Sequence, residues 1–143
     1  ARLCCTRCRR VANLGDQLKA IAERNKVKLS LVVRKTVLDM AGQMIRLSPV
    51  DTGRFRSNWQ YGGGLMNTDT GSRIDASGAS SIGRITAGIG GWRPGETMWI
   101  TNSLPYAQRL ESGWSKQAPA GVVRTTFASF EAHFARAFGE VAA

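Results

Sequence analysis

Three cysteines near the N-terminus are the residues of this chain most suggestive of chemistry. Cys5 and Cys8 have the Cys-x-x-Cys spacing of a zinc site, and Cys4 could supply a third thiolate ligand. A structural zinc ion needs four ligands, which usually come as two close pairs. The only histidine, His133, lies far along the chain. The sequence therefore favours reduced thiols over a metal centre.

Motifs of catalysis are missing from the sequence. There is no Gly-x-x-x-x-Gly-Lys-Ser/Thr loop for a nucleotide and no Gly-x-Ser-x-Gly elbow for a hydrolase. Carboxylates from separate loops can be paired at will, so they do not indicate general acid–base catalysis. His133 is expected on the surface or rim of an amphipathic helix. We expect no enzyme activity, no catalytic residue, no metal and no cofactor.

Positive charge is concentrated at the start of the chain. The net charge is +10, and residues 1–35 hold ten lysines and arginines against two acids. Residues 1–13 are expected to form a basic arm, in which Arg7, Arg9 and Arg10 could contact DNA or an acidic partner. The alternative is a solvated arm that aids solubility. No apolar run is long enough to span a membrane, so no membrane partner is expected.

The elements that must position these residues can be read from hydrophobic periodicity. Residues 14–143 are long enough for a single domain. Apolar residues recur at helical spacing from 14 to 47, and Pro49 should end that helix near Ser48. We predict an α+β fold with this long N-terminal helix, a small antiparallel β-sheet, a long glycine-rich loop or hairpin at 62–83 and a C-terminal amphipathic helix.

Alternation of apolar and polar residues predicts three strands, at 55–61, 83–89 and 97–103. Residues 104–113 are predicted as a short helix that Gly113 ends. The last helix is predicted at 121–138, with one apolar stripe facing the core. The members of that stripe are Val123, Phe127, Phe130, Phe134 and Phe138.

A polar turn follows the long helix. Its residues are Pro49, Asp51, Thr52, Gly53 and Arg54. Asp51 and Thr52 can bond nearby backbone amides, and Gly53 tolerates a positive φ. The turn itself implies no catalysis.

Two segments in order resemble the tail-completion (neck, or head-to-tail joining) proteins of long-tailed bacteriophages. The segment Ser48–Ser57 is similar to the family's Pro-x-Asp-Thr-Gly-x-Leu-Arg-x-Ser junction, with Phe55 where leucine is usual. The segment Asn102–Gly113 resembles the family's Asn-x-x-Pro-Tyr-Ala-x-x-Leu-Glu-x-Gly pattern, and it makes Tyr106, Leu110, Glu111 and Gly113 candidates for an assembly interface. The resemblance covers residues 14–138, and the cysteine-bearing arm has no counterpart in it.

The resemblance implies a structural role in the virion, with assembly in the host cytoplasm. Such proteins form a ring at the head–tail junction through which DNA passes. Six copies would match a tail tube, and the partners would be the head connector or portal-side adaptor and the tail terminator or tail-tube proteins. A tail-completion role and a terminator role both fit. The alternatives are a small basic nucleic-acid-binding protein and a zinc-dependent module or enzyme.

Overall fold

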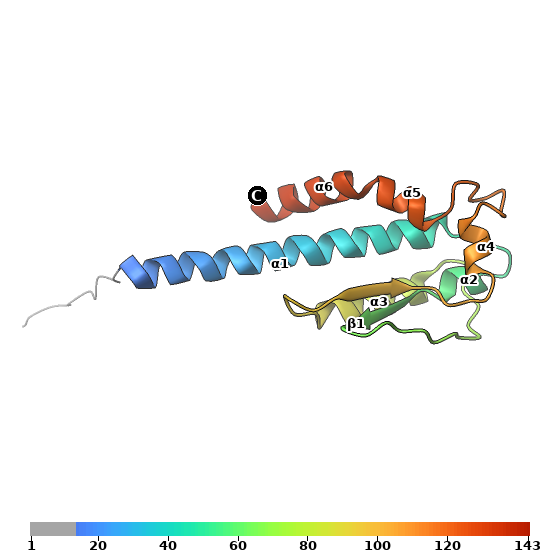
Figure 1. Ribbon diagram of the computed structural model, residues 1–143, viewed down its shortest axis with the longest axis horizontal. Helices are drawn as coiled ribbons and strands as arrows, with labels where there is room; N and C mark the ends of the chain where they lie inside the picture. Colours follow the sequence, from blue (N-terminus) through green and yellow to red (C-terminus); the bar gives the residue numbers. More distant parts are fainter. Residues whose placement is uncertain (1–13) are drawn as a thin grey trace, which may run out of the picture.

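The computed structural model describes residues 14–143 (Figure 1). The predicted basic arm, with Cys4, Cys5 and Cys8 and with Arg7, Arg9 and Arg10, lies outside the described residues.

One long helix organises the molecule. Helix α1 spans Leu14–Leu47, as the periodicity predicted. Its C-terminal half lies between two layers, whereas its N-terminal half extends beyond both (Figure 1). Ser48 ends the helix: its hydroxyl donates to the carbonyl of Met44 at 2.7 Å. The carbonyls of Arg46 and Ser48 accept hydrogen bonds from the Arg56 guanidinium at 3.0 and 2.8 Å, which satisfies acceptors that a helix end leaves unpaired.

The layer on one side of α1 combines a small sheet with a helix. Strands β1 (Gln60–Gly63) and β2 (Met98–Thr101) pair antiparallel, with Gln60 opposite Thr101 and Gly63 opposite Met98. Helix α3 (Ala79–Gly90) packs against both α1 and β1. The buried apolar core lies mainly between this layer and α1. Its residues are Ala41, Met44, Ile45, Phe55, Trp59, Ile85, Ile89, Leu104, Ala118 and Val122.

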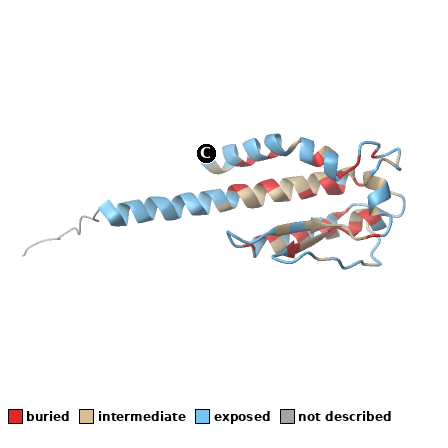
Figure 2. Ribbon diagram, viewed as in Figure 1, coloured by how far each residue is buried: buried red, intermediate tan, exposed pale blue. Residues whose placement is uncertain are grey.

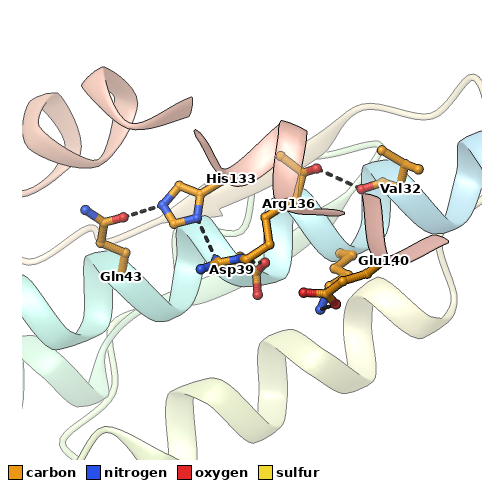
Figure 3. Close-up of polar contacts among 8 residues, drawn as sticks. Val32, Asp39, Gln43, His133, Arg136 and Glu140 are labelled. Carbon is orange, nitrogen blue, oxygen red and sulfur yellow. Dashed lines mark hydrogen bonds and ion pairs between the residues drawn. The ribbon is translucent and has the colours of Figure 1, made fainter. Parts of the chain in front are cut away.

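The layer on the other side of α1 is helical. Helices α4 (Ala107–Glu111) and α5 (Val123–Ala128) lead into α6 (Phe130–Ala142), which runs antiparallel to α1 (Figure 1). Polar pairs show which residues of α1 and α6 lie opposite each other. Lys35 forms an ion pair with Glu140 at 2.8 Å, and Asp39 pairs with Arg136 at 3.0 Å. Gln43 contacts His133 (Figure 3). Residues one turn apart on α1 thus pair with residues one turn apart on α6, in the reverse order.

Two of the three predicted strands are wrong. Residues Arg54–Ser57 form the short helix α2, and the strand that follows is only β1. The predicted strand at 83–89 lies within α3. Phe55 and Trp59 are both buried, as are Ile85 and Ile89. A spacing of four residues fits one face of a helix as well as one face of a strand, so the apolar pattern was ambiguous.

The predicted stripe of the last helix is also wrong as a core element. A break at Ser129 divides the segment into α5 and α6. Phe127, Phe130, Phe134 and Phe138 are 67%, 41%, 38% and 57% exposed. The buried residues of α6 are His133 and Ala137, so His133 is not the surface residue that we expected. The reason is that α6 packs on α1 through its small and polar side.

The fold class itself is confirmed: the chain is mixed α+β and mostly helical, with a long N-terminal helix, a two-stranded antiparallel sheet and a C-terminal helix. Residues 64–78 hold neither helix nor strand, so this glycine-rich loop ends where α3 begins. Strand β2 lies within the predicted 97–103, and α4 lies within the predicted 104–113. In the part of the chain that the structure describes, no helix is apolar over a stretch long enough for a membrane span.

Candidate functional site

The two sequence motifs meet at one cleft, although about fifty residues separate them in the chain. The cleft has a volume of about 390 Å³. One wall is the turn 49–55 that follows α1, and the other wall comes from α4 and the loop after it. From the second wall, Tyr106, Leu110, Trp114 and Gln117 line the cleft. The fold therefore brings together residues that the sequence alone placed in separate motifs.

Gly53 determines the shape of the first wall. Its φ is 89°, a left-handed conformation that glycine adopts without the steric cost of a Cβ atom. The hydroxyl of Thr52 accepts a weak hydrogen bond from the Arg54 amide at 3.4 Å. Asp51 and Arg54 are exposed, and among residues 14–143 the Asp51 carboxylate has no hydrogen-bond partner. The turn therefore holds a free carboxylate at the rim of the cleft.

Amide side chains hold the two walls at a fixed separation. Gln117 forms a pair of hydrogen bonds with Val50, one from its own amide group to the Val50 carbonyl and one from the Val50 amide, each at 3.0 Å. Asn102 donates to the carbonyl of Phe55 at 2.9 Å and accepts from Asn58 at 3.2 Å. Our sequence analysis assigned no role to Gln117, Asn58 or Asn102. Only Asn102 carried a signal, because it opens the second motif.

Arg56 connects the first motif to the glycine-rich loop. Besides the end of α1, its guanidinium binds the carbonyl of Ala76 at 2.9 Å. Two neighbours extend this connection: the Ser57 hydroxyl donates to the Arg73 carbonyl at 2.6 Å, and Asn58 accepts from the Gly71 amide at 2.8 Å. The loop is therefore fixed to the body of the domain along residues 71–76.

Glu111 of the second motif is engaged within the chain. Its carboxylate accepts hydrogen bonds from the backbone amides of Val122, Val123 and Arg124, each at 2.9 Å. These amides open α5, where a helix leaves donors unpaired and favours negative charge. Gly113 follows α4 with φ 88°, as predicted for a glycine that ends a helix. Both residues thus shape the loop that presents Trp114.

Aromatic side chains form the exposed rim of the second wall. Trp114 is 77% exposed and Tyr106 is 37% exposed. The Arg109 guanidinium lies 5.9 Å from the centroid of the Trp114 ring, a cation–π distance. The Tyr106 ring contacts the buried Phe55 ring, with centroids 6.1 Å apart. Exposed aromatic residues beside a charged group are typical of a protein-binding surface.

The lining of the cleft shows no arrangement typical of a catalytic centre. Its lining contains no histidine or cysteine, and its acidic residue is Asp51. Among the described residues 14–143, no cluster of histidine, cysteine and acidic side chains could hold a metal ion. His133 is buried elsewhere, between α6 and α1 (Figure 3). Arg136 donates to its Nδ1 at 3.1 Å, so Nε2 carries the proton that faces Gln43. This histidine therefore links α6 to α1 through Gln43.

Comparisons with known proteins are consistent with this picture. The model of a family described as "Bacteriophage HK97-gp10, putative tail-component" matches residues 12–89. The matched segment runs from α1 into α3, so it contains the first wall of the cleft and ends before the second. No curated protein and no solved structure matches the chain.

Proposed function

Because the chain belongs to the HK97-gp10-like family of bacteriophage tail components, we propose that it is a structural protein of the virion neck. In this role its subunits form a closed ring at the head–tail junction, most simply of six copies. The ring completes the tail and joins it to the head connector, and DNA passes through its lumen. The protein assembles in the host cytoplasm and catalyses no reaction.

The observation that carries this proposal is the convergence of both motifs on one exposed cleft. Tyr106 and Trp114 offer aromatic surface, and Asp51 offers a carboxylate without a partner in the described chain. Hydrogen bonds between Gln117 and Val50 hold the cleft walls together, so the shape of the cleft is already formed before another protein docks there. We assign this cleft to the adjacent ring of the virion, either the portal-side adaptor or the tail terminator and tube.

Complementation of a phage that lacks the gene tests the proposal. We expect the deletion to leave filled heads and free tails that do not join, as seen by electron microscopy, and the wild-type gene to restore complete virions. A Trp114→Ser/Asp51→Lys gene should fail to restore joining although its protein folds. A Thr86→Ala gene is the matched control, because Thr86 is exposed on α3 and does not line the cleft. Complete virions from the deletion would overturn the role in joining.

The second candidate function is generic DNA binding. The described chain supports it through Lys19, Arg24, Lys26 and Lys28, which are all exposed on the N-terminal half of α1. Binding of this kind would depend steeply on salt, because phosphate contacts release counterions. Arg7, Arg9 and Arg10 would add to it. Tight, salt-sensitive DNA binding by a purified monomer that forms no ring would favour this function over the neck role.

A further inference from the structure

Over most of its length, the N-terminal half of α1 is not covered by any other helix or strand that the structure describes. We call residues 14–31 the projecting half. Every residue from 14 to 29 is exposed (Figure 2), including Leu14 at 72%, Leu18 at 57% and Ile21 at 46%. Helices in proteins gain most of their stability from packing an apolar face against another element. The projecting half therefore needs a partner.

A second uncovered surface lies on α5 and α6. We call Phe127, Phe130, Phe134 and Phe138 the phenylalanine ladder. Successive rings lie 6.1, 6.1 and 6.4 Å apart and are nearly parallel, with interplanar angles of 21–24°. From the area that an aromatic side chain buries, the exposed fractions of the four rings correspond to roughly 300–500 Å². Apolar patches of this size on a subunit are often functional.

The two surfaces are continuous. An apolar groove of about 390 Å³ lies where α6 ends beside α1, and its lining includes Leu29 and Val32 of α1 with Phe138 and Val141 of α6. From Val32 towards the N-terminus, Leu29, Asn25, Ile21, Leu18 and Leu14 follow at intervals of three or four residues. This spacing keeps them on one face of a helix. The face of α1 that α6 covers thus continues beyond α6, where no other element of residues 14–143 covers it.

We propose that the projecting half of one subunit lies on the phenylalanine ladder and groove of the next subunit. The proposal rests on the proposed ring and names the contact that closes it. Two different surfaces meet in such a contact, so it is heterologous, and heterologous contacts repeat from subunit to subunit until a ring closes.

Charge favours this pairing over a contact between two projecting halves. Residues 14–31 carry Lys19, Arg24, Lys26 and Lys28 against Asp16 and Glu23, so two copies of this segment repel each other. The ladder is bordered by Glu131, which is exposed and has no ion-pair partner in the described chain. Although Lys28 lines the groove and Arg124 precedes the ladder, Glu131 gives the ladder an acidic contact for the basic projecting half that a second projecting half does not offer at its net positive charge.

The available area also agrees with a stable contact. A specific interface buries about 800 Å² on each partner. The ladder alone supplies about half of that area, and the groove and the adjoining surface of α1 lie next to it. On the other partner, the exposed stripe from Leu14 to Ile21 rises over seven residue steps and spans roughly 10 Å. The ladder from Phe127 to Phe138 rises over eleven steps and spans roughly 16 Å, so it is long enough to receive the whole stripe.

A mixing experiment with the purified full chain tests this contact. The ladder variant is Phe130→Ser/Phe134→Ser, and the helix variant is Leu18→Ser/Ile21→Ser. The matched control is Val27→Ser/Leu31→Ser, because these residues are 60% and 46% exposed on the same half of α1 but lie off the stripe. Native mass spectrometry should find rings for wild type and control and monomers for each variant alone. Mixed in equal amounts, the two variants should form one-to-one dimers, because each supplies the surface that the other has lost.

Several outcomes would overturn the proposal. If wild type forms a ring and either variant also does, this contact is wrong while the proposed ring stands. If the mixed variants stay monomeric, or if the control also loses the ring, the contact is likewise wrong. If wild type forms no ring, the proposed ring falls together with the contact.

Should a variant lose its helical circular dichroism, a disulfide cross-link replaces the mixing experiment. With Cys4, Cys5 and Cys8 changed to serine, Leu18→Cys/Phe134→Cys must give disulfides between subunits, in oligomers of the wild-type ring size. The absence of these disulfides overturns the contact.

Discussion

Gly53 lies so close to Ala76 that no side chain fits between them. A Cβ atom built on Gly53 would lie 2.4 Å from the backbone nitrogen of Ala76, at a φ of +89°. The turn after α1 is therefore in direct contact with the glycine-rich loop. This contact explains why the first motif needs glycine at this position and how the loop is held against the body of the domain.

We expect Gly53→Ala to destabilise the chain by more than the cost of a left-handed residue alone. That conformational cost is about 1–2 kcal/mol, and displacement of the 75–76 backbone adds to it. The matched control is Gly64→Ala, because Gly64 has φ +71° but no atom within 4 Å of its Cβ position. Urea denaturation should show a clearly larger loss for Gly53→Ala. Equal losses at the two positions would mean that the contact with Ala76 contributes nothing.

The sequence was most informative where an apolar pattern extended over many turns or where turn-forming residues bounded a segment. Asn25 and Lys26 interrupt the stripe of the long helix and left a kink or break open, but α1 is continuous there. The long helix was predicted at its observed bounds, because its stripe extends over many turns and Pro49 follows it. Strand β2 was predicted for a similar reason, since turn-forming residues bound it on both sides. The loop at 64–78 followed from its polar and glycine-rich composition.

Helix α3 shows why the rest could not be predicted. Its glycines argue against a helix, since glycine is a poor helix former. Gly88 is nevertheless required, because a Cβ there would lie 2.2 Å from the ring of Tyr61. Close packing between α3 and β1 outweighs the local preference, and no local pattern reports a contact made 27 residues away. The cleft was missed for the same reason: its two walls are neighbours only in the folded chain.

The structure gives Glu111 a specific role, as the acceptor for the backbone amides that open α5. We expect Glu111→Gln to lower stability by about 1–2 kcal/mol, because three helix-opening amides lose a charged acceptor. Asp69→Asn is the control, since Asp69 is exposed, lies outside the helices and has no hydrogen bond to its carboxylate among residues 14–143. Thermal unfolding at neutral pH would measure both. Unchanged stability in Glu111→Gln, with loss of assembly, would instead make Glu111 an interface residue, as the family resemblance implies.

The exposed phenylalanines give a prediction that reverses the expectation from sequence. If Phe130 or Phe134 were core residues, replacing either of them with alanine would lower the free energy of unfolding by about 3–5 kcal/mol. Because they are 41% and 38% exposed, we expect the isolated subunit to lose about 1 kcal/mol or less. Ile85→Ala is the comparison, since Ile85 is 0% exposed and should lose about 2–5 kcal/mol. Urea unfolding of the protein, at a concentration dilute enough to keep it monomeric, measures the loss for all three variants. Losses for the phenylalanines as large as for Ile85 would place them in the core after all.

Asp75 should make the stability of the folded chain depend on pH in the acidic range. Hydrogen bonds from the Ser77 hydroxyl and from the backbone of Ser80 hold the pKa of the Asp75 carboxyl well below its usual range. Because the folded-state pKa is lowered, the stabilisation is fully present above the unfolded pKa of about 3.9 and is lost as pH falls further towards the folded value. We expect Asp75→Asn to melt below wild type at pH 7, and the difference between the two melting temperatures to be smaller at pH 2. Asp69→Asn is the control, because no hydrogen bond to the Asp69 carboxylate forms in the described chain, and it should melt like wild type at both values. A melting difference between Asp75→Asn and wild type that does not change with pH would show that the carboxylate's charge is not what holds the turn before α3.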